Sequence, residues 1–216
     1  GNDIEEVTKL IFDHAGITAK HIKDRKFTVT VAADVPAGTY DARLVGKYGV
    51  TNPRLFTVQR GMAEVTEVNT NEDREKAQAV AVNNVVNGTS KGGKESVFRF
   101  PAKKGQRVVS ECFAQRLDSQ LDGVLTITDA DGRALASSSD YFGKDPLAEF
   151  VALADGNYFV VLTDLTLRGG HPYRLVITDK PHVENLFPPV VQAGKKSDLT
   201  VFGSNLGTGA KPSALT

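Results

Sequence analysis

The chain has no tryptophan, one cysteine and one methionine, and its formal net charge is zero. A single cysteine excludes an internal disulfide, so the fold must be stable without a covalent cross-link. Scarce cysteine suits a reducing cytosol, and it equally suits a bacterial envelope protein that does not use disulfides. No apolar run approaches the roughly 18 residues of a membrane-spanning helix, so we expect no membrane insertion.

The chain also has no excess of positive or negative charge. The 26 Lys and Arg are matched by 26 Asp and Glu, and basic residues mostly stand beside acidic ones, as in the stretches HIKDRK and NEDREK. Without a basic stripe there is no field that would attract a nucleic-acid backbone. We therefore expect no nucleic-acid partner.

Catalytic patterns are equally scarce. The sequence has no Gly-x-Ser-x-Gly motif, and its four histidines form no metal-binding pair such as HExxH. Cys112 lies inside the alternating stretch VVSECF, which predicts a small core residue rather than a reactive thiolate. We therefore expect a protein that is not an enzyme.

Short strands dominate what is present. Between residues 95 and 178, apolar and polar residues alternate in short runs, interrupted by Gly, Asp and Asn about every ten residues. This pattern is typical of an all-β sandwich of antiparallel strands. The stretch KFTVTV shows the same period, with Phe27, Val29 and Val31 on one face. Asn87-Gly88 predicts a tight hairpin turn.

Changes of composition divide the chain into four parts. Residues 1–60 form a first β unit, and residues 61–76 are polar and acidic, which indicates a linker. Residues 77–180 hold about eight predicted strands, enough for a closed sandwich. Residues 181–216 contain further strands and a tail rich in Gly, Ser and Pro.

The polar loop SSSDYFGKDP is the best candidate for ligand binding. Tyr141 and Phe142 stand together there between Asp140 and Asp145. Exposed rings of this kind stack on sugar faces while neighbouring polar groups bind hydroxyls. A second loop adds Arg168 and His171. The alternative, which the usual burial of aromatic rings favours, is that the rings close one end of the sandwich.

An ordered set of short motifs carries a family resemblance over residues 64–180. The pieces, in order, are EVN with a later Ala, then FRF, GQ, LDGVLTITDADGRALA, an acidic loop, ADGNYFVVLTD and YRLVI. This order resembles the bacterial pre-peptidase C-terminal (PPC) domain, which implies a jelly-roll-like β-sandwich. Domains of this family typically accompany secreted peptidases.

The resemblance also raises the question of calcium, because some PPC domains hold calcium with an acidic linker. Glu67, Asn69, Asn71 and Asp73 would supply the oxygens that calcium prefers. The chain departs from the family pattern ahead of the first main strand, where Lys94 would oppose a cation. A solvated acidic linker is the favoured alternative, so we expect no cofactor; calcium bound by this segment is the other possibility.

The flanking segments are similar to immunoglobulin-like IPT/TIG domains. Residues 199–206 (LTVFGSNL) resemble the opening strand of that family, and residues 27–58 resemble its closing half. Neither half buries a sandwich core alone. We therefore predict that 181–216 completes 1–60, within one chain or by strand swapping in a homodimer; the alternative is that the last segment packs on the central domain.

These observations together predict a non-catalytic binding or adhesion module of a larger bacterial protein. We expect the protein to be secreted, periplasmic or in the cell envelope, and its ligand to be a polysaccharide or an extracellular protein. The alternatives are a structural spacer in a tandem array and an accessory domain of a secreted peptidase. Exposure of Tyr141 and Phe142 would favour binding, whereas burial of both rings would favour the spacer.

Overall fold

The computed structural model describes residues 6–207 and 211–212. The chain forms two compact units, one of Gly1–Met62 with Arg116–Asp118 and one of Ala63–Gln115 with Ser119–Thr216. The ends of the predicted ranges 1–60 and 181–216 that fall on 1–5, 208–210 and 213–216 lie outside the described residues. Both units are built of strands, as the alternating pattern predicts.

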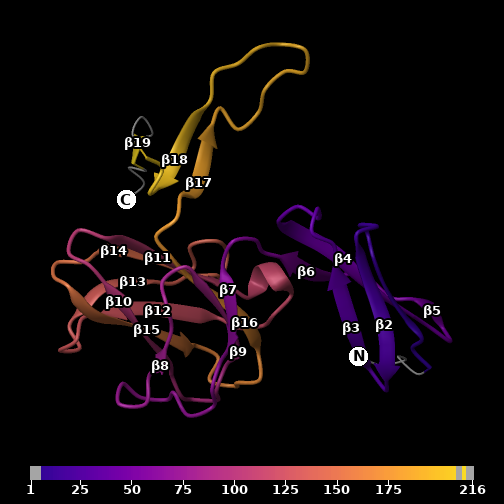
Figure 1. Cartoon of the computed structure of the whole chain (residues 1–216), viewed down its shortest axis with the longest axis horizontal. Coiled ribbons are helices and arrows are strands. Elements are labelled where there is room, and N and C mark those ends of the chain that lie inside the picture. The colour runs from indigo at the N-terminus through magenta and orange to yellow at the C-terminus, as the bar shows by residue number, and fades with distance from the viewer. Residues whose placement is uncertain (1–5, 208–210, 213–216) are drawn as a thin grey trace. The chain divides into compact units, whose positions relative to one another are not determined.

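The N-terminal unit consists of a four-stranded sheet and a two-stranded hairpin, and Figure 1 labels its strands β2 to β6. Its strands are β1 (Lys9–Phe12), β2 (Ile17–Lys23), β3 (Lys26–Val31), β4 (Gly38–Gly46), β5 (Gly49–Val50) and β6 (Arg54–Val58). Strand β4 pairs with β1, β5 and β6, all antiparallel. The predicted strand over residues 26–31 is confirmed, and it pairs with β2.

The core of the N-terminal unit is small. Val7, Ile17 and Val35 are its buried apolar side chains. The rings of Phe12 on β1 and Phe56 on β6 meet edge to face, with centroids 5.0 Å apart. Among the described residues of this unit, six larger apolar side chains stay exposed: Ile11, Ile22, Val31, Tyr48, Val50 and Leu55.

The second unit contains a sandwich of two five-stranded sheets, which we call the central sandwich. One sheet has the order β13-β12-β15-β10-β8 and the other β14-β11-β16-β9-β7. The strands are β7 (Ala63–Thr66), β8 (Gln78–Ala79), β9 (Asn84–Thr89), β10 (Ser96–Ala102), β11 (Arg107–Phe113), β12 (Gly123–Thr128), β13 (Ala134–Ser138), β14 (Leu147–Val151), β15 (Gly156–Asp164) and β16 (Pro172–Thr178).

One continuous core lies between these two sheets. Phe98 and Phe100 enter it from β10 and Leu175 and Ile177 from β16, and all four are fully buried. Alternate residues of each strand point into the core. The alternation of apolar and polar residues in the sequence therefore marks the side chains that face the core. Cys112 is buried in the same cluster, so its prediction as a core residue is confirmed.

The predicted turn at Asn87-Gly88 is wrong, because β9 continues through both residues. Gly88 lies opposite Tyr173 of β16. A Cβ atom on Gly88 would lie 2.5 Å from Tyr173 Oη and 2.6 Å from Glu67 Oε2. Gly88 is therefore needed because a side chain at this position would collide with the buried Tyr173. In the sequence alone, the same Asn-Gly pair is indistinguishable from a turn motif.

We expect Gly88→Ala to lower the free energy of unfolding of the central sandwich by about 1–3 kcal/mol, because the added methyl overpacks a closed site. Chemical denaturation followed by far-ultraviolet circular dichroism measures the loss. Gly156→Ala is the matched control, since a Cβ there meets no atom within 4 Å. Equal stability of the two variants would contradict the packing role of Gly88.

The segment 61–76, expected as a linker, contributes an edge strand. Its residues 63–66 form β7, which runs parallel to β9. Farther along, the carbonyl of Asn71 accepts a hydrogen bond from Val97 N at 2.9 Å, and Asn71 is completely buried. The segment is therefore tied to the sandwich along its length.

Strands β17 (His182–Phe187), β18 (Thr200–Ser204) and β19 (Lys211–Pro212) form a separate three-stranded sheet. Three of its apolar side chains, Val183, Leu186 and Phe187, are exposed. The hypothesis that these strands complete residues 1–60 stays a prediction. No helix in the described part of the chain is long and apolar enough to cross a membrane.

Candidate binding surface

The loop between β13 and β14, residues 139–146, is built around a buried carboxylate. Asp145 is completely buried, and its Oδ1 accepts hydrogen bonds from Ala114 N at 2.9 Å and Gln115 N at 2.7 Å. These two hydrogen bonds make Asp145 an anchor for the loop, and its role as a ligand-binding residue stays a prediction. The sequence offers no local sign of the anchoring role, because the two amides lie about thirty residues away, at positions 114 and 115.

Further contacts fix the shape of this loop. Phe142 and Asp145 exchange backbone hydrogen bonds of 3.0 and 3.1 Å. Lys144 pairs with Asp122, and its backbone N donates to Gln115 Oε1 at 2.8 Å. The loop is therefore pre-organised before it meets any ligand.

Tyr141 presents its ring at the surface of this loop. Its side chain is 39% exposed, and its ring meets that of Phe142 edge to face with centroids 4.8 Å apart. The hydroxyl donates a hydrogen bond to Glu184 of β17. Desolvation, followed by the hydrogen bond to Glu184 and nearby carboxylates, raises the pKa of Tyr141 to about 12. The hydroxyl of Tyr141 therefore ionises even less readily than that of an ordinary tyrosine, which is already neutral at physiological pH.

The second predicted loop has different anchors. Arg168 is exposed, and the backbone N of His171 donates to Ser90 Oγ at 3.2 Å. Ser90 Oγ in turn donates to the buried Asp164 at 3.0 Å. The six predicted ligand-binding residues thus lie on two separately anchored loops, and the aromatic pair belongs to the first.

The acidic segment after β7 folds around a lysine. Lys91 Nζ donates to Asn71 Oδ1 and lies 3.5 Å from the carbonyl oxygen of Val68. It also lies 3.3 Å from Glu67 Oε1, an ion pair whose side chains are 13% and 4% exposed. Two of the four predicted calcium ligands, Glu67 and Asn71, therefore converge, and the group between them is an ammonium.

Two other acids of this segment pair with lysines, whereas Glu75 is exposed. Asn69 is exposed, while Asp73 pairs with Lys76 at 2.9 Å and Glu72 pairs with Lys94 at 2.7 Å. The hydrogen bonds from these lysines lower the pKa of Glu72 and of Asp73. A carboxyl group whose pKa is lowered in the folded state stabilises the fold at pH values above the ordinary pKa of that group. This contribution is lost as the pH falls through the folded-state pKa.

Metal-ligating side chains do not gather elsewhere. In the described residues, no three His, Cys, Asp or Glu side chains come close enough together to hold a metal ion.

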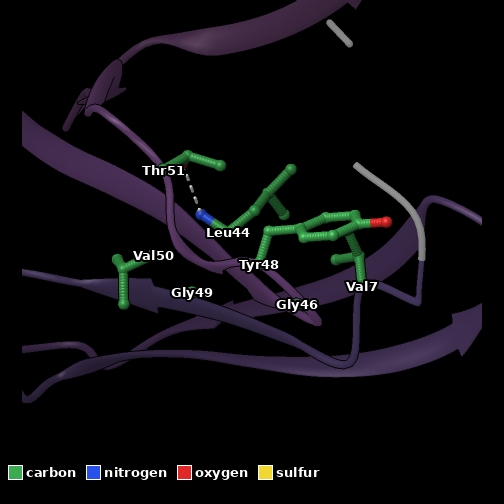
Figure 2. Close-up of a pocket in the computed structure, with 7 residues that line it drawn as sticks. All are labelled: Val7, Leu44, Gly46, Tyr48, Gly49, Val50 and Thr51. Atoms are coloured by element: carbon green, nitrogen blue, oxygen red, sulfur yellow. Dashed lines mark hydrogen bonds between the residues drawn. The ribbon is translucent and has the colours of Figure 1, made fainter. Parts of the chain in front are cut away.

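Each unit also has a shallow hollow that the sequence did not indicate. In the N-terminal unit a hollow of about 170 Å³ lies among Val7, Leu44, Tyr48 and the turn that follows. Figure 2 shows the Tyr48 ring beside Val7, and the hydrogen bond from Leu44 N to Thr51 Oγ1. The central sandwich has a hollow of about 360 Å³, lined by Val82, Pro101, Ala102, Lys103, Gln106, Gly156 and Asn157. Both linings combine residues from separate strands, so no local motif marks them.

The chain is similar to two solved structures at low sequence identity. No family model matches the chain, and no curated protein matches it. One similar solved structure is the pre-peptidase C-terminal domain of a collagenase from Bacillus anthracis, with 16% identity and a TM-score of 0.40 over 47% of this chain and 94% of that one. Another is SGBP-B of a Bacteroides ovatus mixed-linkage glucan utilization locus in complex with a heptasaccharide, with 9% identity and a TM-score of 0.25 over 82% and 68%.

Proposed function

We propose that this chain is a non-catalytic binding module of a larger bacterial protein and that it holds a polysaccharide on the Tyr141 loop. The observation that carries the proposal is the exposed ring of Tyr141 on a pre-organised loop. A ring that is already fixed loses little conformational entropy when a ligand stacks on it. The position of the loop on an end of the sandwich also suits a binding site.

The chemistry of the loop favours a sugar ligand. The face of a neutral aromatic ring packs against the apolar face of a sugar ring. Asp140 beside Tyr141 is exposed, and its carboxylate would accept hydrogen bonds from sugar hydroxyls. The hydroxyl of Tyr141 is engaged by Glu184, so the ring face is the part of Tyr141 that a ligand would use.

A secreted or cell-envelope location belongs to the same proposal. It is supported by the resemblance of residues 64–180 to PPC domains and of the flanks to IPT/TIG domains, both of which we associate with extracellular proteins. A catalytic partner domain, such as a peptidase, would then lie elsewhere in the parent protein.

The test is retention of the purified chain on a panel of insoluble polysaccharides, with collagen-like proteins as a second panel. We expect retention on one polysaccharide, a loss of about tenfold or more in affinity for Tyr141→Ala, and near-normal binding for Tyr141→Phe, which keeps the stacking ring. Tyr48→Ala is the matched control, because Tyr48 is an exposed tyrosine of the other unit.

Three results would contradict the proposal. Retention lost in Tyr48→Ala but kept in Tyr141→Ala would move the site to the N-terminal unit. Equal loss in Tyr141→Phe would show that the hydroxyl, rather than the ring face, matters. Retention only on the protein panel would identify an extracellular protein as the ligand.

A structural spacer is the second candidate, and one contact favours it. The hydrogen bond from Tyr141 to Glu184 ties the loop of the central sandwich to β17, and Ser204 of β18 likewise bonds to Glu149 of β14. These contacts would stiffen the junction between consecutive modules. Absence of retention on every polymer, with faster amide exchange of β17 in Tyr141→Phe, would favour the spacer.

A further inference from the structure

We infer that Lys91 is the built-in structural cation of the acidic segment: its ammonium takes the place that a divalent metal ion would need, so the segment folds without metal and removal of Lys91 creates a calcium site. The inference is independent of the ligand-binding proposal. It concerns Glu67 and Asn71, two of the four residues at which the sequence suggested calcium.

The geometry around Lys91 resembles a cation site. Lys91 follows the end of β9, and its Nζ reaches Glu67 Oε1, Asn71 Oδ1 and the carbonyl oxygen of Val68. These are a carboxylate, an amide and a backbone carbonyl, the three kinds of protein oxygen that ligate calcium. A metal bound by the same three oxygens would have to occupy the position of Nζ.

Because the Glu67 carboxylate is buried, its negative charge needs a cation beside it. Asn71 is completely buried, and the Glu67 side chain is 4% exposed. A buried carboxylate without a cation partner is strongly unfavourable. Glu67 Oε2 accepts a hydrogen bond from Thr89 N at 3.1 Å, whereas Oε1 has no hydrogen bond of good geometry and faces the ammonium.

A second buried oxygen, the hydroxyl of Tyr173, lies close to Glu67. Tyr173 Oη is buried without a hydrogen bond of good geometry, and it adjoins the Gly88 position beside Glu67 Oε2. Burial first, and then the negative charge of Glu67, raise the pKa of Tyr173. The site thus concentrates oxygens around one carboxylate, and Lys91 is the cation that faces it.

Two further carboxylates near Lys91 are also paired with lysines. Glu72 is paired with Lys94, and Asp73 with Lys76. Each carboxylate of residues 67–73 therefore has a lysine partner. A calcium ion beside Lys91 would also be repelled at short range by the ammonium.

The experiment compares thermal unfolding of the full chain in millimolar calcium and in chelator, with isothermal calorimetry of calcium binding. Wild type is expected to show the same melting temperature in both conditions. Lys91→Gln should melt roughly 5 °C lower in chelator, because Glu67 loses its charged partner. It should recover part of that loss in calcium, since a ligand that binds the folded state stabilises it.

Lys94→Gln is the matched control, because the Lys94–Glu72 pair is exposed, with side chains 58% and 34% accessible. We expect it to melt near wild type and to show no response to calcium. Lys91→Gln with Glu67→Gln removes both charges and should lose the calcium response while regaining stability relative to the single variant.

Several outcomes would overturn the inference. Stabilisation of wild type by calcium would show that a metal is the resident cation, and this test needs no variant to fold. An unchanged melting temperature for Lys91→Gln would show that the ammonium is not structural. A destabilised Lys91→Gln that does not respond to calcium would show that the oxygens do not form a latent metal site.

Discussion

Phe100→Ala is expected to lower the free energy of unfolding of the central sandwich by about 3–5 kcal/mol, the largest effect of any single change we predict. Phe100 is completely buried on β10. Its ring packs against Phe150 of β14, in the opposite sheet, with centroids 6.0 Å apart. It also lies 6.3 Å from the ring of Tyr158 on β15. Removal of the ring opens a cavity between the sheets.

The cluster cannot close around such a cavity, because the other two rings are fixed. Phe150 and Tyr158 are in contact with centroids 4.8 Å apart, and the Tyr158 hydroxyl donates to Ala154 O at 2.8 Å. A cavity that does not collapse carries both the lost transfer free energy and the lost packing. Phe100→Leu should therefore lose much less than Phe100→Ala.

Urea denaturation followed by circular dichroism, together with residue-resolved amide exchange, measures the effect. Amides of β1–β6 serve as the internal reference, because they belong to the other compact unit. Leu153→Ala is the surface control, since Leu153 is 69% exposed, and it should change stability by less than about 0.5 kcal/mol. A Phe100→Ala variant as stable as this control would contradict the assignment of the core.

Asp145→Ala is expected to lower the free energy of unfolding by about 2–4 kcal/mol, because two backbone N–H groups lose their acceptor. Ala114, which donates one of these bonds, is completely buried, so water does not replace the carboxylate there. Asp145→Asn keeps one side-chain oxygen and should lose less. The same chemical denaturation and exchange measurements apply, with residues 114–115 and 139–146 as the reporting amides.

Asp140→Ala separates the structural role of Asp145 from a binding role. Asp140 is exposed in the same loop, so its removal should leave stability within about 0.5 kcal/mol of wild type. If Asp145→Ala remained fully stable yet lost polysaccharide retention, Asp145 would be a ligand residue, as the sequence suggested. Loss of stability accompanied by loss of loop order would support the anchoring role.

Local features of the sequence were enough for most strands. The alternating stretch at residues 26–31 was predicted as a strand, and it is β3. The residues Asp129–Gly132, rich in Asp and Gly, form a tight turn closed by a hydrogen bond from Gly132 N to Asp129 O at 3.2 Å. These features depend on side chains and backbone angles within a few residues, so a single stretch contains the information.

Features that depend on distant partners were not predictable in this way. Gly88 was predicted as a turn residue, because the sequence does not show that Tyr173 lies across from it. Strand β7 was predicted as linker, because its partner β9 runs parallel to it and leaves no hairpin signal.

The composition and periodicity of the sequence determined the all-β class, the apolar faces and the absence of a disulfide. The tertiary structure decided which polar residues are available to a ligand. Asp145 and Glu67 look alike in sequence as acids in polar segments, yet one caps two distant amides and the other faces an ammonium. The reason is that charge compensation and hydrogen bonding of buried groups depend on which residues the fold brings together, whereas strand formation depends mainly on near neighbours.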